Sequence, residues 1–213
     1  MVNRILLISP HPDDAFIGCG GYVLKNGSNL IVDIVCLASS NLQPSDDKRI
    51  AEEIATWESV ENSSDASVNL YFFKQGKDTQ LSRNTEDIIQ YIESLLKSHK
   101  YDRIFTPFID DTHQDHREAS MCTLSASRYQ KNIFFYETPS TLNFHPSIFL
   151  ELKDEEARIK THIARHYESQ VFGTSQDYKI DLCDYVKTRL LATGLKSRVC
   201  KYAEGYKPYR SLF

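Results

Sequence analysis

A histidine and two carboxylates lie together directly after the first apolar run of the chain. They are His11, Asp13 and Asp14, in the segment Ser9-Pro10-His11-Pro12-Asp13-Asp14. The prolines on either side of His11 restrict the backbone and favour a non-helical presentation of the ring. Because His11 and Asp14 are three residues apart, one tight turn can direct both side chains at the same ion. This segment therefore predicts a catalytic metal site.

A second cluster of the same chemistry lies in the middle of the chain. It reads Asp110-Asp111-Thr112-His113-Gln114-Asp115-His116 and follows another apolar run at 103–108. The carboxyl ends of parallel strands lie at one edge of an open α/β sheet, where such folds bind ligands. Two histidines and a carboxylate suit a divalent transition metal, usually Zn²⁺, with one coordination position left open for water or substrate. Either cluster alone could be an acidic surface loop, but two clusters that both follow predicted strands indicate one site.

Strand-like apolar runs alternate with helical patterns, which predicts the elements that position the two clusters. The alternation is typical of an α/β fold with a mostly parallel sheet that helices cover on both faces. Strands are expected at 4–9, 30–37, 68–73, 103–108, 133–137 and 148–153. Helices are expected at 20–25, 47–61, 85–99, 115–129, 155–170 and 181–192.

Helix caps and substrate-facing loops follow from the same assignment. Thr85 and Asp115 are the expected N-caps of two helices. The polar stretches at 41–47 and 75–84 come after the second and third strands, at the edge that carries the clusters. These two loops are therefore expected to face the substrate.

Composition and charge limit the class of protein. The 213 residues fit one domain that spans 1–213, large enough to bury a substantial core. A formal net charge of −4 leaves no basic footprint for nucleic acid. The chain has no apolar stretch of membrane-spanning length and no signal-peptide pattern, and its five cysteines lack a CxxC spacing. These features predict a cytoplasmic protein with reduced thiols that has no membrane span and does not bind nucleic acid.

The motifs together resemble those of a known enzyme family. The segments His11-Pro12-Asp13-Asp14, Gly18-Cys19-Gly20-Gly21 and His113-Gln114-Asp115-His116 are similar to the signature of the PIG-L (LmbE-like) family of zinc-dependent de-N-acetylases. Three later segments agree in order: Tyr136-Glu137, His166-Tyr167-Glu168-Ser169-Gln170 and Tyr202-Ala203-Glu204-Gly205-Tyr206. The resemblance implies a Rossmann-like fold and hydrolysis of an N-acyl group, commonly acetate from an N-acetylglucosamine unit.

The spacing and the resemblance together suggest which residues bind the metal. They are His11, Asp14 and His116, with Zn²⁺ as the default and Fe²⁺ or another divalent ion as the alternative. Such an ion lowers the pKa of a bound water toward neutrality. From spacing alone, His113 could instead be a second histidine ligand from its segment. The resemblance assigns His113 to the tetrahedral intermediate, where a cationic imidazole would stabilise the oxyanion or protonate the leaving nitrogen.

Two further carboxylates near the ligands have candidate roles. Asp13 is not needed as a ligand if Asp14 serves, so it is the candidate general base. The alternative is that Asp13 only caps the following helix. Asp115 is expected to accept an N–H from one of the imidazoles, as carboxylates behind metal ligands do.

Substrate contacts are predicted from a looser match to the family. Arg49, Asp78 and Glu204 fall near positions where the family binds its substrate, although exposed charges are the ordinary alternative. The chain departs from the family at Ala15, where many members have glutamate. It also has Asp110-Asp111 where the inositol-conjugate branch places a tyrosine.

The function predicted from the sequence is a metal-dependent hydrolase that removes an N-acetyl group from an amino sugar or a related conjugate. One alternative is cleavage of another N-acyl or thiol-conjugate amide with the same metal site. A second is a non-catalytic sugar-binding protein, against which the presence of both Asp13 and His113 argues. A nucleotide-binding role is weak because the glycines at 18–21 lack the GxGxxG spacing. The expected partner is a small amino-sugar substrate, and the sequence leaves a homo-oligomer open.

Overall fold

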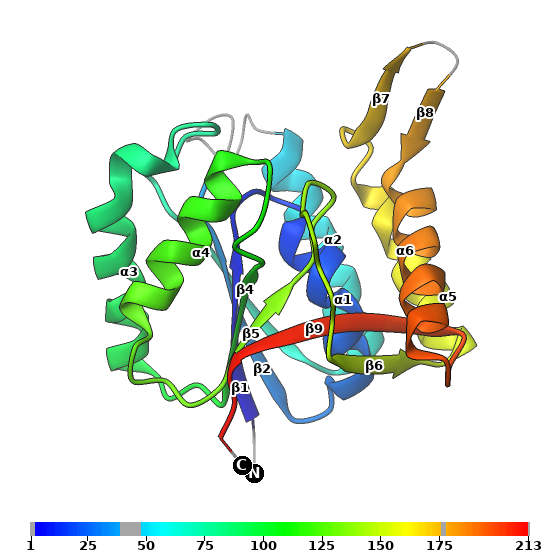
Figure 1. Cartoon of the computed structure of the whole chain (residues 1–213), viewed down its shortest axis with the longest axis horizontal. Coiled ribbons are helices and arrows are strands. Elements are labelled where there is room, and N and C mark those ends of the chain that lie inside the picture. The colour runs from blue at the N-terminus through cyan, green and yellow to red at the C-terminus, as the bar shows by residue number, and fades with distance from the viewer. Residues whose placement is uncertain (1–2, 39–47, 176–177, 213) are drawn as a thin grey trace.

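A seven-stranded sheet forms the centre of the molecule (Figure 1). The computed structural model describes residues 3–38, 48–175 and 178–212. The strand order is β3-β2-β1-β4-β5-β9-β6, in which the first five are parallel and β9 is antiparallel to both of its neighbours. A hairpin of β7 and β8 stands apart. The strands are β1 (Asn3–Ser9), β2 (Leu30–Cys36), β3 (Ser67–Phe72), β4 (Arg103–Pro107), β5 (Ile133–Tyr136), β6 (Ile148–Leu152), β7 (Val171–Ser175), β8 (Tyr178–Asp181) and β9 (Tyr202–Arg210).

Helices cover both faces of this sheet. In Figure 1, α3 and α4 lie on one side, and α1, α2, α5 and α6 lie on the other. Among the described helices, none has the length and apolar composition that crossing a membrane requires. The helices are α1 (Asp14–Asn26), α2 (Lys48–Ser64), α3 (Thr85–Ser98), α4 (Gln114–Ala126), α5 (Asp154–Ile163) and α6 (Leu182–Ser197), with short 3₁₀ turns at Leu81–Asn84 and Ala164–His166.

The central strand β1 is buried on both faces, as its continuous apolar sequence predicts. Ile5 and Leu7 pack with the α1 side of the core, while Leu6 and Ile8 pack with the α3 side. All four are fully buried. Strand β1 is therefore a rigid base for the loop that follows it.

The strand order places that loop beside the start of α4. The chain moves from β1 outward to β2 and β3, and then returns to the other side of β1 with β4 and β5. Ligands bind at such a switch point, because the loops after the two central strands diverge and leave a crevice. The loop after β1 contains His11, and the loop after β4 leads to His113 and His116.

The predicted fold class is confirmed: the sheet is mostly parallel and helices cover both faces. The six predicted strands are present within about two residues of their expected ends. Strand β9 and the β7–β8 hairpin were not predicted. The predicted helix 155–170 ends at Ile163, where a 3₁₀ turn follows. The loop at 41–47 lies outside the described residues.

The predicted helix caps were wrong. Thr85 is the first residue of α3 rather than its cap. The cap of α4 is His113, whose side chain accepts the backbone N–H of Asp115. Capping by a histidine is uncommon compared with Ser, Thr, Asp or Asn, so the sequence pattern favoured the nearby aspartate.

Helix α1 begins at Asp14, six residues before the predicted start, and so includes Gly18 as well as Gly20 and Gly21. Close packing explains these glycines. A Cβ on Gly18 would lie 2.2 Å from the Tyr136 ring, and one on Gly21 would lie 2.5 Å from Leu152. Ala15 is fully buried in the same apolar cluster. The glycines therefore let α1 approach the sheet and β6 closely.

A buried ion pair ties α1 to α5 and β9. The Lys160 ammonium group donates to Glu204 Oε1 at 2.5 Å and to the carbonyl of Ile17 at 2.6 Å. The other Glu204 contacts come from the backbone N–H groups of Gly21 and Tyr22, at 2.6 and 2.7 Å, and from the Tyr206 hydroxyl. Lys160 is 1% exposed and Glu204 4% exposed. The pair is therefore a structural connection inside the domain.

Loss of one member of this pair is expected to destabilise the fold strongly. Lys160→Met leaves the Glu204 carboxylate buried without its counter-ion, which costs about 3–5 kcal/mol of unfolding free energy. Urea unfolding followed by circular dichroism measures this loss. Lys25→Met, which removes an exposed hydrogen bond to Glu151, is the control and should change stability by less than about 1 kcal/mol. Equal stability of the two variants would contradict the prediction.

Candidate metal centre

The loop between β1 and α1 presents His11 in a fixed orientation. Ser9 Oγ donates to the carbonyl of His11 at 2.6 Å and accepts the N–H of Ala15 at 2.9 Å. The backbone N–H of His11 donates to Asp14 Oδ2 at 3.1 Å. His11 and Asp14 are 5% and 3% exposed. The turn is thus closed by its own hydrogen bonds.

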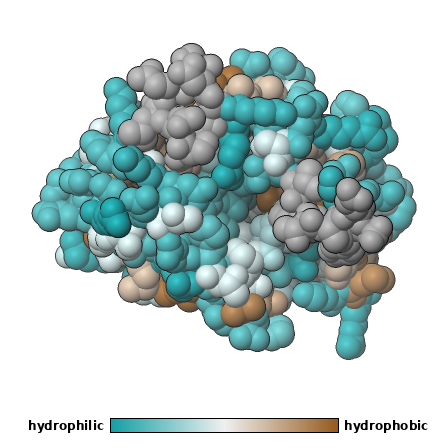
Figure 2. Space-filling view, turned by 90° about the horizontal axis from the view of Figure 1, so that it is seen from above, coloured by the Kyte–Doolittle hydropathy of each residue, from teal (hydrophilic) through white to brown (hydrophobic). Residues whose placement is uncertain are grey.

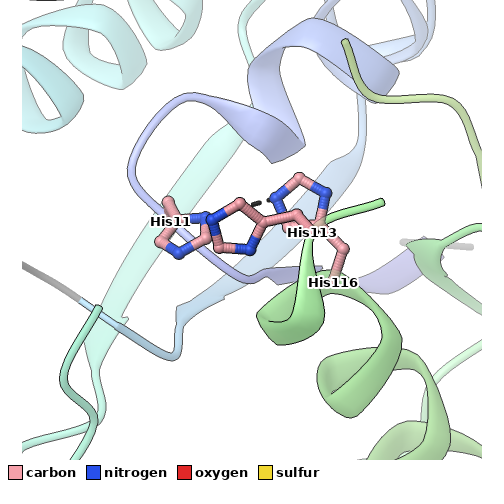
Figure 3. Close-up of side chains that lie close together, drawn as sticks. All are labelled: His11, His113 and His116. Atoms are coloured by element: carbon pink, nitrogen blue, oxygen red, sulfur yellow. Dashed lines mark hydrogen bonds between the residues drawn. The ribbon is translucent and has the colours of Figure 1, made fainter. Parts of the chain in front are cut away.

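Three side-chain atoms of the predicted ligands form a nearly equilateral triangle. His11 Nδ1 lies 3.2 Å from His116 Nε2 and 3.3 Å from Asp14 Oδ2, and the last two atoms are 3.2 Å apart. Figure 3 shows the rings of His11 and His116 facing one another, with His113 beside them. Ligands at the usual zinc distances of about 2.0–2.1 Å in a tetrahedral site are separated by about 3.3 Å. The three residues therefore fit a Zn²⁺ ion.

Carboxylates behind the two histidine rings complete this arrangement. His116 Nδ1 lies 3.0 Å from Asp111 Oδ2, and His11 Nε2 lies 3.2 Å from both Asp115 Oδ2 and Asp78 Oδ1. Such contacts orient the rings and keep the metal-facing nitrogens as acceptors. Burial alone would lower the pKa of His116, but Asp14 and Asp111 raise it to about 9. The site strongly favours a bound positive charge.

Asp111 was not identified as a site residue from the sequence. The prediction gave the carboxylate role to Asp115, which the structure places behind His11, where it also accepts the N–H groups of Thr79 and Leu81 at 2.6 and 3.1 Å. Asp111 takes the corresponding position behind His116. Its place in the loop after β4 and five residues before His116 is the signal that could have found it.

His113 lies against both His11 and His116. Its ring is stacked on His116 with 4.8 Å between centroids and meets His11 edge-on at 4.7 Å. As the cap of α4, His113 Nδ1 accepts the N–H of Asp115 at 3.2 Å. The neutral ring therefore carries its hydrogen on Nε2. Burial and the neighbouring His11 and His116 lower the pKa of His113, so the surroundings favour this neutral form at pH 7 over the predicted cation.

Asp13 does not cap α1. It stands at the N-cap position with φ 113° and makes no side-chain hydrogen bond to the helix. Its carboxylate lies 3.8 Å from the Arg49 guanidinium. The Gln170 amide, oriented with its nitrogen toward Asp13, donates to Oδ2 at 3.1 Å. Burial and the adjacent Asp14 raise the pKa of Asp13 well above its usual value, which suits a proton acceptor.

A pocket of about 390 Å³ opens over these residues. Its size lies in the range of small-molecule sites. The face of the molecule toward which these loops point is mostly hydrophilic (Figure 2). The pocket is lined by the three predicted ligands and by Asp13, Ile17, Arg49, Asp78, His113, Pro139, Ser140 and Gln170.

Two of the three predicted substrate contacts line the pocket, and the third does not. Arg49 and Asp78 line the pocket, and their side chains are 3.5 Å apart. Glu204 does not line it, because its carboxylate is buried beside α1 and both oxygens are hydrogen-bonded to Lys160, Tyr206 and the helix backbone. The loop at 75–84 reaches the site through Asp78, as predicted.

The chain is similar in sequence or in structure to several known proteins. The chain is 26% identical over 178 residues to "Uncharacterized deacetylase YaiS" of Escherichia coli (strain K12), which covers 78% of this chain and 90% of that protein. The structure of this chain is similar to that of N,N'-diacetylchitobiose deacetylase from Pyrococcus horikoshii, with a TM-score of 0.73 and 20% identity. The match covers 97% of this chain and 83% of the deacetylase. The structure is also similar to that of GalB, the 4-carboxy-2-hydroxymuconate hydratase of Pseudomonas putida KT2440, with a TM-score of 0.77, 16% identity, and 99% and 98% covered.

The sequence model of one family covers both histidine clusters. This model, PIG-L: GlcNAc-PI de-N-acetylase, matches residues 6–127, from β1 through the end of α4. The match therefore includes more than half of the chain and all of the residues that form the triangle. The chain belongs to the PIG-L family.

Proposed function

We propose that this protein is a metal-dependent hydrolase that removes an N-acetyl group from an amino sugar or an N-acetylglucosamine-type conjugate. The observation that carries the proposal is the triangle of His11, Asp14 and His116 atoms in one pocket with Asp13 and His113. Family membership supports a de-N-acetylase. The acetylated disaccharide in the name of the Pyrococcus horikoshii enzyme supports an amino sugar.

His11, Asp14 and His116 would hold the metal, with Zn²⁺ as the proposed ion. When bound, a zinc ion in such a site lowers the pKa of water and polarises a carbonyl oxygen. The remaining face of the triangle is open toward the pocket, which leaves room for the amide. The carboxylates Asp111, Asp115 and Asp78 behind the rings would help to hold the charge.

Asp13 is proposed to move the protons of the reaction. Its raised pKa and its position beside the ligands suit a base that takes a proton from the attacking water. The same carboxyl group can then return the proton to the departing amine, so that one group serves both halves of the reaction. Arg49 and Gln170 hold the carboxylate in the pocket.

His113 is proposed to stabilise the tetrahedral intermediate. The hydrogen on Nε2 can bond to the carbonyl oxygen as negative charge develops there. Because Nδ1 is engaged with the backbone of Asp115, the ring is oriented before the substrate arrives. A neutral donor is sufficient for this role and does not require protonation at pH 7.

Release of acetate from defined substrates tests the proposed function. Purified protein loaded with Zn²⁺ is incubated with N-acetylglucosamine, N,N′-diacetylchitobiose and an N-acetylglucosaminyl inositol conjugate, and free acetate and free amine are measured together. Equal amounts of both products on at least one substrate are expected. Because the GalB likeness at 16% identity concerns the fold alone, hydration of an unsaturated carboxylic acid is measured in parallel. Hydratase activity without acetate release would contradict the proposal.

Replacing His113 with alanine is expected to lower kcat more than it raises KM, because the proposed hydrogen bond strengthens only as the oxyanion forms. One such donor is worth about 10²–10³ in kcat. Since the lowered pKa of His113 leaves the ring neutral above pH 7, the kcat/KM profiles of variant and wild type should have the same shape from pH 7 upward. A basic limb that disappears in His113→Ala would show that the cation is the active form.

We also propose a cytoplasmic location. Cys19, Cys36, Cys122, Cys183 and Cys200 are all free in the structure. Free thiols suit a reducing compartment.

A further inference from the structure

Asp13 has a backbone conformation that residues other than glycine rarely adopt. Its φ is 113° and its ψ is −38°, in a region that the Cβ atom disfavours. The residue is 6% exposed and stands between the two ligands of the β1–α1 loop. Such a conformation persists only where the surroundings hold it, and it is often found at functional sites. The contacts of the Asp13 backbone are therefore informative.

The group that holds this backbone is Glu53, from the middle of α2. The N–H of Asp13 donates to Glu53 Oε2 at 2.9 Å. The Glu53 side chain is fully buried. Neither the spacing of the two residues nor the family motifs quoted above point to this contact, because it joins the β1–α1 loop to a helix 40 residues further along the chain.

Other buried donors fix the Glu53 carboxylate in turn. The Tyr167 hydroxyl donates to Oε2, the same oxygen that accepts the Asp13 N–H. Trp57 Nε1 donates to Oε1 at 2.8 Å, and Cys36 Sγ lies 3.6 Å from that oxygen. These donors are uncharged groups from α2, β2 and the turn after α5. The carboxylate is thus held in one place by three separate elements of the fold.

The same segment that carries Tyr167 also reaches the side chain of Asp13. Gln170 donates to Asp13 Oδ2 at 3.1 Å, while Ser169 is tied to Glu52 of α2 by two hydrogen bonds. The backbone of Asp13 is therefore held through Glu53 and Tyr167, and its carboxylate through Gln170. Residues 167–170 take part in both connections, through Tyr167 in the first and Gln170 in the second, which explains what this segment contributes to the site.

We infer that Glu53 is a positioning residue for the reaction: it holds the backbone of Asp13 so that the carboxylate faces the open side of the metal triangle. This inference rests on the proposed function. A displacement of about 1 Å of a catalytic group can cost about 10²-fold in rate. A side chain that only stabilised the core would affect the stability of the fold, whereas a positioning residue affects the rate through Asp13.

The test replaces the acceptor without changing its size. Glu53→Gln replaces one carboxylate oxygen by an N–H₂ group, which cannot accept the N–H of Asp13 or of Trp57, so one of these two contacts must break. The remaining amide oxygen is uncharged and is a weaker acceptor for the other contact. We expect kcat to fall by at least about tenfold, with KM within about twofold and metal content, measured by mass spectrometry, equal to that of the wild type. Kinetics use the panel substrate that releases acetate fastest.

A double-mutant cycle separates positioning from a general loss of stability. In an Asp13→Asn background, the addition of Glu53→Gln should change the residual kcat by less than about threefold, because the group it positions is already lost. Val60→Ala is the matched control. Val60 is fully buried on the same helix, and within the described residues no hydrogen bond joins it to Asp13. This variant should lower the thermal midpoint and leave kcat within about threefold of wild type.

Two results would overturn the inference. One is a Glu53→Gln enzyme with wild-type kcat; the other is an equal fractional loss of kcat in the wild-type and Asp13→Asn backgrounds. If Glu53→Gln does not fold, Tyr167→Phe takes its place, and a kcat equal to that of Val60→Ala then counts against the inference. A wild-type protein that releases no acetate would instead overturn the proposed function itself, and with it this role for Glu53.

Discussion

Alanine substitution of His11, Asp14 or His116 is expected to remove both the bound metal and the activity. Each residue contributes one corner of a triangle with sides of 3.2–3.3 Å, and two remaining ligands cannot hold a divalent ion tightly. Metal content per chain, measured by mass spectrometry after dialysis, should fall from near one to near zero. Acetate release should fall below detection, because the activation of water depends on the ion.

The control for this experiment is another histidine outside the cluster. His145 is exposed, and His145→Ala should keep full metal content and rate. Full metal content in all three ligand variants would overturn the assignment of the ligands. Loss of metal on His113→Ala as well would mean that both histidines of the second cluster bind the ion, which the spacing alone allowed.

Asp13→Asn is expected to keep the metal and the fold while kcat falls by about 10²–10⁴, the usual range for a lost general acid–base group. Asparagine has the size of aspartate, and its backbone N–H can still donate to Glu53. The measurement is steady-state kinetics together with metal analysis. A rate near that of the wild type would mean that another group accepts the proton, and loss of metal would mean that Asp13 and Asp14 have exchanged roles.

The pH profile gives a second readout of the same residue. Burial and Asp14 raise the pKa of Asp13, so the carboxyl group loses its proton, and becomes an active base, only as the pH rises past the usual range for aspartate. A bound cation moves this pKa back downward. The kcat/KM of the wild type should therefore rise with pH along an acidic limb, and Asp13→Asn should lack the part of that limb that Asp13 contributes.

Much of the fold could be predicted because the order of apolar and polar residues along the chain indicates which strands are buried. The unbroken apolar runs at β1 and β4 have the composition of strands that are covered on both faces, and both are central. The start of α1 was predicted six residues too late, because Gly18 is an unfavourable residue for a helix. Close packing against the Tyr136 ring explains why a glycine is present inside the helix at this position. Strand β9 was missed because a strand that returns antiparallel between β5 and β6 has no local sequence signature of its partners.

Of the residues that the structure brings together at the candidate site, the sequence pointed to those that are close together in the chain. His11, Asp13 and Asp14 share one turn, and His113 and His116 begin one helix, so each group could be recognised by its spacing. Asp111, Glu53 and Gln170 act on these residues from a strand end, a second helix and a distant loop. Their types alone did not distinguish them from surface carboxylates and amides.

The sequence by itself determined which reactive side chains are present and at which edge of the sheet they lie. Residue type decides which atoms can bind a metal or accept a proton, and the alternation of strands and helices places the loops after β1 and β4 side by side. Only the tertiary structure decided how each group is used. Glu204 became an internal ion-pair partner of Lys160, His113 a neutral cap of α4, and Asp13 a strained residue held by Glu53. The physical reason is that pKa values and side-chain orientation depend on burial and on hydrogen-bond partners, which packing brings together from distant parts of the chain.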